Sequence, residues 1–323
     1  MSEVIKCDRY DVAIIGAGPA GLAAATTLKK IGIDRVLVLD RESVAGGIPR
    51  HCGHSPFGVI EYARVMTGPS YAKRLVETAQ RVGIEIALKT SVISLNSGGA
   101  LSVVSPEGVR VIKAKRVLLA TGVRETPRSA RLVSGGRMLG ISTTGALQSM
   151  IYLKNLIPFR NPVVIGTEAV SFSALLTCKK AGIRPAALLE EKPKSTIPWP
   201  FYHASRLLAA PLFVNTRIIN IMGKERVETV QVSDGMGKIR EIDCDGVLFT
   251  GQFTPESTLS RMSHLELDQK TGSPVIDKFG RCSDPVYYAA GNLLQPLNMA
   301  LNCWREGRKT ARWIAKDLYG TIL

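Results

Sequence analysis

Residues 11–40 read DVAIIGAGPAGLAAATTLKKIGIDRVLVLD, and this stretch decides the fold. It predicts a buried strand, a glycine turn, a helix and a second buried strand that ends in an acid. Gly16, Gly18 and Gly21 give the spacing G-x-G-x-x-G directly after the first strand, as a dinucleotide-binding βαβ unit requires. Gly16 makes the tight turn, Gly18 lets the backbone approach a pyrophosphate, and Gly21 lets the helix lie close to the sheet.

The acid at the end of the second strand supports a bound nucleotide. Asp40 follows Gly16 by 24 residues, which places its carboxylate to accept hydrogen bonds from a ribose diol. The N-terminus of the intervening helix would face the phosphates with its positive end. The residues that we predict to contact the cofactor in this unit are Gly16, Gly18, Pro19, Ala20, Gly21, Asp40 and Arg41.

The bulk composition is that of a globular protein. The chain has 323 residues, enough for two domains of ordinary size, and 45% of them are hydrophobic. No apolar run approaches the ~20 residues that span a bilayer, and the N-terminal stretch lacks the apolar core of a signal peptide. We therefore expect no transmembrane segment, no export and a cytoplasmic location.

The cysteines argue against several cofactors. None of them forms a Cys-x-x-Cys pair, which disfavours an iron–sulfur site, a structural zinc site and a disulfide framework. Scattered single cysteines are typical of a reducing compartment. The six positions are Cys7, Cys52, Cys178, Cys244, Cys282 and Cys303.

The formal net charge is +15, which is high. Nucleic-acid binding is one interpretation, but the lysines and arginines do not cluster, and we expect no nucleic-acid partner. Solvated surface charge explains most of the excess. An acidic partner subunit or an anionic substrate, drawn in by long-range attraction, is the remaining interpretation.

Two later stretches complete a recognisable pattern. Residues 116–122 (RVLLATG) predict a buried strand that ends in Ala-Thr-Gly, and residues 281–292 (RCSDPVYYAAGN) predict a short strand followed by Ala-Gly-Asn. A helix is expected from about Met299. Together with the first βαβ unit, these stretches resemble the FAD-binding motifs of the pyridine nucleotide–disulfide oxidoreductase superfamily.

The resemblance implies an α/β fold with two Rossmann-like dinucleotide-binding domains, the second inserted into the first. The FAD-binding domain would comprise residues 1–125 and 250–323, and the inserted domain residues 126–249. The family usually has an acid where this chain has Asn292, whose carbonyl can still accept a hydrogen bond. The final helix would point its N-terminus at the flavin. The further FAD contacts implied are Gly47, Thr121, Gly122, Gly291, Asn292, Met299 and Ala300.

The inserted domain repeats the βαβ pattern with a damaged fingerprint. Residues 162–191 read PVVIGTEAVSFSALLTCKKAGIRPAALLEE, in which Gly166 keeps the first glycine position. Glu168 and Ser171 occupy the second and third. In this superfamily the inserted domain binds NAD(P)H, but a carboxylate at Glu168 would repel a pyrophosphate by about 1–4 kcal/mol. Glu190 could still hold a ribose and would disfavour a 2′-phosphate, so we expect the inserted domain to bind NAD(H) poorly and NADPH less well.

Residues 46–58 (GGIPRHCGHSPFG) place a lone cysteine between two histidines. Disulfide reductases of the superfamily carry Cys-x4-Cys here, and those positions fall on Pro49 and His54, so dithiol chemistry is excluded. Single-cysteine chemistry stays open, because Arg50, His51 and His54 are expected to lower the pKa of Cys52. A structural loop thiol and a role in electron passage or partner contact are the alternatives.

His51 and His54 have their own interpretations. Proton transfer or anion contact beside the flavin suits imidazole, which titrates near neutrality. Ordinary loop histidines are the alternative. A metal would need further ligands nearby in sequence, and none occurs, so we predict no metal. The candidate catalytic residues are accordingly Cys52, His51 and His54.

A narrower resemblance concerns residues 46–58, the run MTGPSYA (66–72) and the run ATGVRETPRSARLVSGGRMLGISTTGALQ (120–148). Together they are similar to the FAD subunits of opine, proline, sarcosine and glycerol-3-phosphate-type dehydrogenase or oxidase complexes and of hydrogen cyanide synthase. This similarity implies an accessory flavoprotein subunit that works with partner dehydrogenase subunits on a small-molecule substrate or electron acceptor. An iron–sulfur cluster, if needed, would come from a partner.

Two other functions remain open. One is a self-contained NADH-dependent flavin reductase, or a single-cysteine peroxidase or oxidase that uses Cys52. The other is a scaffold whose FAD is structural. Locally, we also predict a hinge ion pair between Arg124 and Glu125, with contact to the cofactor as the alternative. Over residues 195–213 we predict a packed loop followed by a helix, with a lid or an interface as the alternative.

Overall fold

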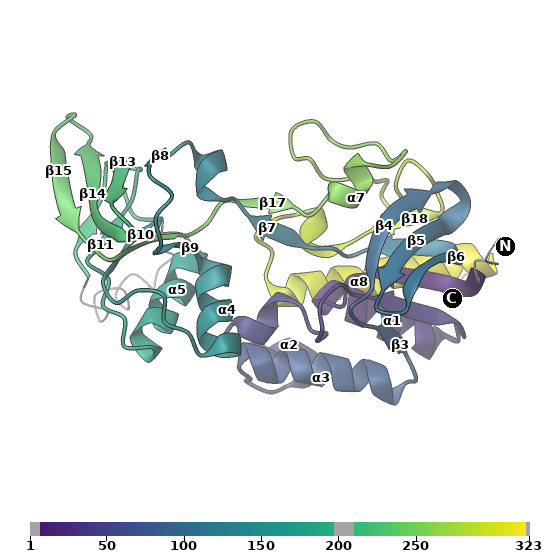
Figure 1. The fold of residues 1–323 in the computed structure, drawn as a ribbon. Coiled ribbons are helices and arrows are strands. Elements are labelled where there is room, and N and C mark those ends of the chain that lie inside the picture. The colour runs from purple at the N-terminus through teal and green to yellow at the C-terminus, as the bar shows by residue number, and fades with distance from the viewer. Residues whose placement is uncertain (1–6, 197–209, 321–323) are drawn as a thin grey trace. The chain divides into compact units, whose positions relative to one another are not determined.

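The computed structural model describes residues 7–196 and 210–320, which form two compact units (Figure 1). The described residues of Met1–Arg50, Ser55–Arg124 and Phe253–Leu323 form unit 1. Those of His51–His54 and Glu125–Gln252 form unit 2. Most of the predicted loop and helix over 195–213 lies outside the described residues.

The first βαβ motif of unit 1 consists of β1 (Cys7–Ile15), α1 (Pro19–Ile31) and β2 (Val36–Leu39). Proline suits the first helical position because its missing N–H would have no partner there. The helix ends at Gly32, which has φ +103° and donates its N–H to the carbonyls of Leu28 and Lys29. The two strands pair in parallel, as the sequence predicts.

The main sheet of unit 1 has the order β3-β2-β1-β6-β5-β4, with β18 paired to β6. Its long strand β6 pairs with β5 along its first half and with β18 along its last three residues. Five strands of this sheet run parallel to one another, namely β3, β2, β1, β6 and β18. Strand β5 runs antiparallel to both of its neighbours, β6 and β4. The bounds are β3 Glu85–Ala87, β4 Ser91–Asn96, β5 Ala100–Ser105, β6 Gly108–Leu119 and β18 Tyr287–Ala289.

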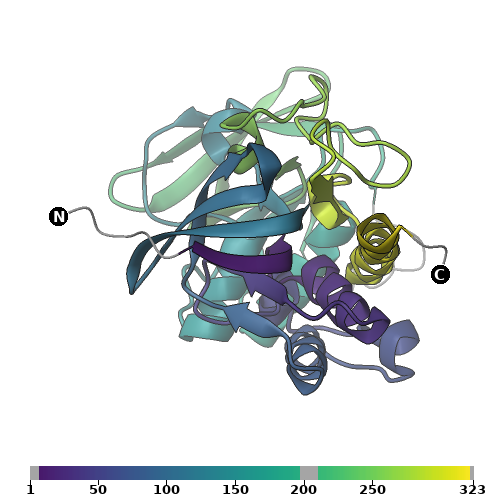
Figure 2. The same ribbon diagram turned by 90° about the vertical axis from the view of Figure 1, so that its right-hand side faces the viewer.

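Three helices cover one face of this sheet, namely α1, α3 (Gly68–Arg81) and α8 (Ala300–Tyr319), and α8 lies beside α1 (Figure 2). Val12 and Ile14 of β1 point into the core beneath these helices, while Ala13 and Ile15 point into the core on the other face. The shorter elements of unit 1 are η1 Ile48–His51, α2 Val59–Tyr62, η2 Ser97–Gly99, α7 Thr258–Arg261 and η4 Gly291–Leu293.

Unit 2 contains a parallel sheet of order β12-β11-β10-β16-β9 and a smaller sheet of order β15-β14-β13-β8. The bounds are η3 Arg128–Arg131, β8 Ser134–Gly135, β9 Ile141–Thr143, α4 Thr144–Lys154, β10 Pro162–Ile165, α5 Ala169–Lys180, β11 Ala187–Leu189, β12 Leu212–Phe213, β13 Thr216–Gly223, β14 Val227–Asp234, β15 Ile239–Asp243 and β16 Gly246–Phe249. Unit 2 thus repeats the strand–turn–helix–strand pattern in β10, α5 and β11.

The chain leaves unit 1 in β7 (Val123–Glu125) and returns just before β17 (Phe253–Pro255), and these two strands pair. The predicted ion pair between Arg124 and Glu125 is wrong. Arg124 binds the carboxylate of Glu256, and Glu125 accepts the N–H of Gly145 at 2.8 Å. Neighbouring residues of a strand point to opposite sides, so the two charges meet different partners.

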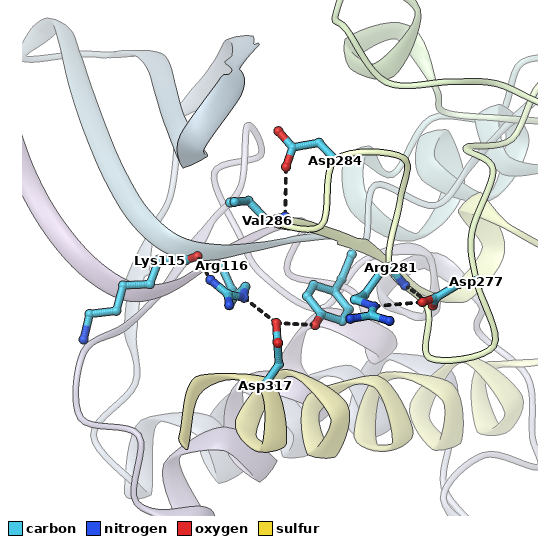
Figure 3. A network of polar contacts seen from close by, with 8 residues as sticks. Lys115, Arg116, Asp277, Arg281, Asp284, Val286 and Asp317 are labelled. Carbon is cyan, nitrogen blue, oxygen red and sulfur yellow. Dashed lines mark hydrogen bonds and ion pairs between the residues drawn. The ribbon is translucent and has the colours of Figure 1, made fainter. Parts of the chain in front are cut away.

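A polar network ties α8 to the main sheet (Figure 3). Asp317 of α8 accepts hydrogen bonds from Arg116 of β6 at 2.6 Å and from Tyr288 of β18 at 2.8 Å. Partial burial works to raise the pKa of Asp317, but these two hydrogen bonds outweigh it and hold the pKa below its usual value. Arg281 pairs separately with Asp277, at 2.8 Å.

Replacing Asp317 with asparagine is expected to destabilise the protein at pH 7 by about 1–3 kcal/mol, because a charge-assisted hydrogen bond is lost. A depressed carboxyl pKa stabilises the fold above the unfolded value of about 3.9, and this stabilisation is lost as the pH falls through the folded pKa. Urea unfolding at pH 7 and pH 3 measures both effects. The difference between the two proteins should be smaller at pH 3 than at pH 7, and an equal difference at both pH values would contradict the assignment. Asp34→Asn, at an exposed position, serves as the small-effect control.

Candidate functional site

The glycine turn of unit 1 joins β1 to α1. Gly16 has φ +112°, and a side chain there would overlap the carbonyl of Ala120. At Gly21, an added Cβ would overlap the carbonyl oxygen of Gly16. Gly18 differs, because it precedes α1 in an extended conformation and the nearest atom to an added Cβ is the Cα of Gly47 at 4.0 Å. The space above Gly18 is therefore open, as a pyrophosphate requires.

The N-terminus of α1 offers donors to that space. No side chain of the described residues caps this helix, and Pro19 has no N–H. The first-turn amides of Ala20 and Gly21 are therefore left to bind an anion. Gly46 donates its N–H to the carbonyl of Ala17 at 2.8 Å, which holds the following Gly47 against the turn.

Asp40 is fixed at the carboxyl end of β2. One carboxylate oxygen accepts the N–H of Ala17 at 2.7 Å, and the other accepts the N–H of Glu42 at 2.9 Å. Each oxygen has a second lone pair, which suits a ribose diol. The next residue, Arg41, lies 3.6 Å from the carboxylate of Glu256.

The carboxyl ends of β6 and β18 carry the other predicted contacts. Thr121, which precedes Gly122, donates its hydroxyl to the carbonyl of Glu256 at 2.8 Å. Gly291 donates its N–H to the carboxylate of Glu306 at 2.9 Å. The side-chain carbonyl of Asn292 accepts the thiol of Cys303 at 3.3 Å, so asparagine keeps an acceptor where the family usually has an acid.

The long helix α8 begins at Ala300, directly after Met299, and no described side chain caps it. Its first turn therefore also presents backbone amides. Negative charge is stabilised at such a position, as on a reduced flavin.

These features fit FAD. The open turn and the amides of α1 suit a pyrophosphate, Asp40 suits a ribose, and the N-terminus of α8 suits the flavin. When bound, FAD would supply the acceptor for two electrons. The residues that would hold it are the predicted ones: Gly16, Gly18, Pro19, Ala20, Gly21, Asp40, Arg41, Gly47, Thr121, Gly122, Gly291, Asn292, Met299 and Ala300.

The candidate catalytic residues His51, Cys52 and His54 lie in the segment that groups with unit 2, whereas the candidate FAD residues lie in unit 1. Cys52 donates its thiol to the side-chain carbonyl of Gln148, with the sulfur and oxygen 3.7 Å apart. The neighbouring Gly53 packs so closely on the ring of Tyr152 that an added Cβ would overlap it. The structure thus places this segment against α4.

Burial raises the pKa of Cys52 to about 12, and the nearby carboxylate of Glu125 adds to the rise. The predicted lowering by Arg50, His51 and His54 is therefore wrong. Desolvation disfavours the thiolate, and the charge that acts on it is the anionic Glu125, not a cation. Cys52 is a neutral thiol at physiological pH.

Two halves of the 120–148 motif meet in unit 2. Glu125 accepts the N–H of Gly145 in the first turn of α4, as a helix-capping carboxylate does. Burial raises the pKa of Glu125, although hydrogen bonds from this turn oppose the rise. One turn further on, the amide of Gln148 donates to Ser173 at 2.8 Å and to Thr177 at 3.3 Å. The motif therefore supplies Gln148, which accepts the hydrogen bond of Cys52, and Glu125, which raises the pKa of Cys52.

Sequence reasoning missed Glu256, a buried carboxylate that binds Arg124 and Arg41 and whose main chain holds Thr121. Arg124 is 132 positions away in sequence, so no local pattern could indicate the pairing. In unit 2, Glu168 directly precedes α5 and makes no capping hydrogen bond with its side chain, and Glu190 follows β11, as their positions in the sequence predict.

In the part of the chain that the structure describes, no helix is long and apolar enough to span a membrane. No group of three or more His, Cys, Asp or Glu side chains in residues 7–196 and 210–320 could hold a metal ion.

Comparison with known proteins places the chain in a family. The family model described as pyridine nucleotide-disulphide oxidoreductase matches residues 10–307. An opine oxidase subunit of Agrobacterium tumefaciens (strain Ach5) is 29% identical over 318 residues, which cover 88% of this chain and 61% of that protein. The alpha subunit of sarcosine oxidase from Rhizobium meliloti (strain 1021) is 24% identical over 264 residues, or 76% of this chain and 24% of that protein.

Among solved structures, the thioredoxin reductase of T. acidophilum superposes with a TM-score of 0.81 at 24% identity, covering 96% of this chain and 98% of that one. This likeness confirms the predicted α/β fold. The chain spans about three fifths of the length of the opine oxidase subunit.

The chain belongs to the pyridine nucleotide-disulphide oxidoreductase family. It is an FAD-dependent oxidoreductase, as the sequence predicts.

Iodoacetamide at pH 8 is expected to label Cys52 at least about a hundredfold more slowly in the folded protein than in urea. With a pKa of about 12, the thiolate fraction at pH 8 is about one in ten thousand, against about a quarter at an ordinary pKa of about 8.5. Peptide mapping by mass spectrometry measures the rate at this one residue, so the unfolded chain is its own control. Rapid labelling of the folded protein would show that the thiol is activated.

Proposed function

We propose that this chain is the accessory flavoprotein subunit of a multi-subunit dehydrogenase of the amine, opine or glycerol-3-phosphate type. It would work in the cytoplasm with one or more dehydrogenase subunits and pass electrons from a small-molecule substrate through its flavin. An acidic partner surface would complement the net charge of +15.

The observation that carries the proposal is the alignment with the opine oxidase subunit over 88% of this chain. The chemistry of Cys52 supports it. The Cys-x4-Cys positions are Pro49 and His54, and Cys52 itself is a neutral thiol held by Gln148. The chain thus has the fold of a disulfide reductase without the Cys-x4-Cys dithiol, which favours electron transfer through the flavin over disulfide reduction.

Purification of a tagged chain from its native host tests the proposal. The expected result is a stoichiometric complex with a second dehydrogenase subunit that reduces a dye when given an amine, an opine or glycerol 3-phosphate. The isolated chain should reduce the dye with none of these substrates. Purification of the chain alone, with full activity towards one of them, would refute the accessory role.

A self-contained reductase or single-cysteine peroxidase is the second candidate, because the likeness to thioredoxin reductase covers 98% of that chain. Anaerobic addition of NADH distinguishes the two functions. Rapid bleaching of the flavin absorbance would favour the independent reductase. For the peroxidase, Cys52→Ser should lower peroxide turnover by about a hundredfold or more, whereas an accessory subunit should lose little activity.

A further inference from the structure

The two glycine turns of this chain have nearly the same backbone. Gly16 has φ +112° and Gly166 has φ +109°. The residues before the two helices are both extended, with φ −84° and ψ −174° at Gly18 and φ −75° and ψ 173° at Glu168. Each turn also has the same sheet hydrogen bond, from Gly16 to Leu39 at 2.8 Å and from Gly166 to Leu189 at 2.9 Å. The inserted domain therefore retains the phosphate turn, and only the side chains differ.

The side chain of Glu168 folds back over its own turn. The hydroxyl of Thr250 donates to its carboxylate at 2.9 Å. The carboxylate fills the space that a side chain on Gly166 or Gly251 would need. At Gly18, the equivalent position in unit 1, there is no side chain, and the nearest atom to an added Cβ is 4.0 Å away. The side chain of Glu168 thus begins where unit 1 leaves its turn open, and its carboxylate covers Gly166 and Gly251.

Arg131, the cation beside this turn, already has hydrogen-bond partners within the chain. Arg131 donates to the carbonyls of Thr250 at 2.9 Å and Gly251 at 2.6 Å, and its guanidinium stacks on Phe249. Burial lowers the pKa of Arg131, while the carboxylate of Glu168 acts against this change. The guanidinium therefore balances the charge of Glu168 and is not left for a phosphate.

Glu190, the acid that would bind a ribose, also has hydrogen-bond partners within the chain. The hydroxyl of Thr167 donates to the carboxylate of Glu190, which also accepts the N–H of Lys192 at 3.0 Å. The N–H of Thr196 in turn donates to the Thr167 hydroxyl at 2.9 Å. Both Thr167 and Glu190 are buried. Unit 1 has only Ala17 at the equivalent place, so its Asp40 faces no side-chain hydroxyl there.

We infer that Glu168 is the residue that makes the inserted domain reject nicotinamide dinucleotides, because its carboxylate takes the place of their pyrophosphate. Thr167 takes the place of a ribose hydroxyl on Glu190. NADH and NADPH are then not the reductants of this flavoprotein, and a reaction that reduces the flavin without a nicotinamide nucleotide must supply its electrons. The inference concerns the inserted domain alone and does not rest on the proposed function.

Calorimetric titration of NADH into the FAD-loaded protein and its variants tests this inference. The unmodified protein should show no binding at about 1 mM. Glu168→Gln removes the charge but keeps the bulk, so it should recover only part of the affinity for NADH. Glu168→Gly, alone or with Ser171→Gly, should bind NADH at least about tenfold more tightly than Glu168→Gln. It should prefer NADH to NADPH, because Glu190 repels a 2′-phosphate.

Glu191→Gln is the matched control, because it removes a neighbouring exposed charge without opening the turn. It should bind NADH no better than the unmodified protein. Glu168→Ala replaces Glu168→Gly if the glycine variant does not fold, as judged by its melting temperature and FAD content. Micromolar binding of NADH by the unmodified protein would overturn the inference. So would a folded Glu168→Gly or Glu168→Ala variant that binds NADH no better than Glu168→Gln.

Discussion

Replacing Gly18 with valine is expected to give a folded protein that binds FAD at least about a hundredfold more weakly, a loss of about 2.7 kcal/mol. The backbone at Gly18, with φ −84° and ψ −174°, is allowed for any residue, and the space above it is open. The valine side chain therefore enters the space that the pyrophosphate needs without disturbing the fold. Fluorescence titration of the apoprotein with FAD measures the loss.

Two other substitutions separate binding from folding. Gly21→Ala in the same motif should lower stability, because its Cβ would overlap the carbonyl oxygen of Gly16. Glu168→Val, at the equivalent position of the inserted domain, should leave the FAD content unchanged. Full FAD content in Gly18→Val would show that this turn does not hold the cofactor.

The helices and strands that carry a local pattern of apolar residues and glycines could be predicted from the sequence. Continuous apolar runs flank the glycines in residues 11–40 and 162–191, and they form β1–α1–β2 and β10–α5–β11 as the sequence predicts. Burial on both faces of a parallel strand leaves this strong signal. Other strands gave little signal. In β15, four of the five residues of Ile239–Asp243 are exposed, so no apolar face marks the strand.

The site was predictable only where sequence neighbours act together. The glycine turns and their acids are local, and the structure shows them at the carboxyl ends of the strands. The surroundings of Cys52 are not local. Gln148, 96 positions away, accepts its hydrogen bond, and burial together with Glu125 raises its pKa. Which residues gather around a thiol depends on tertiary packing, which single-sequence patterns do not encode.

Replacing Gly307 with alanine is expected to destabilise the protein by about 3 kcal/mol, the upper part of the usual range for overpacking. Gly307 lies in the middle of α8, where an added Cβ would overlap the carbonyl oxygen of Ala20 in α1. A main-chain oxygen in a helix cannot move aside as a flexible side chain can. The two helices would therefore be forced apart.

The direction of the change in stability tests this prediction. In a helix without such a contact, alanine is more favourable than glycine by about 0.5–1 kcal/mol, so propensity alone predicts a stabilised protein. Urea unfolding of the apoprotein decides between propensity and packing. Arg312→Ala, at an exposed position of the same helix, should change stability by less than about 0.5 kcal/mol. A Gly307→Ala protein as stable as the unmodified one would mean that α8 does not approach α1 this closely. Because α1 and α8 both begin at residues that we assign to FAD, separating them should weaken FAD binding together with the fold, whereas Gly18→Val weakens binding alone.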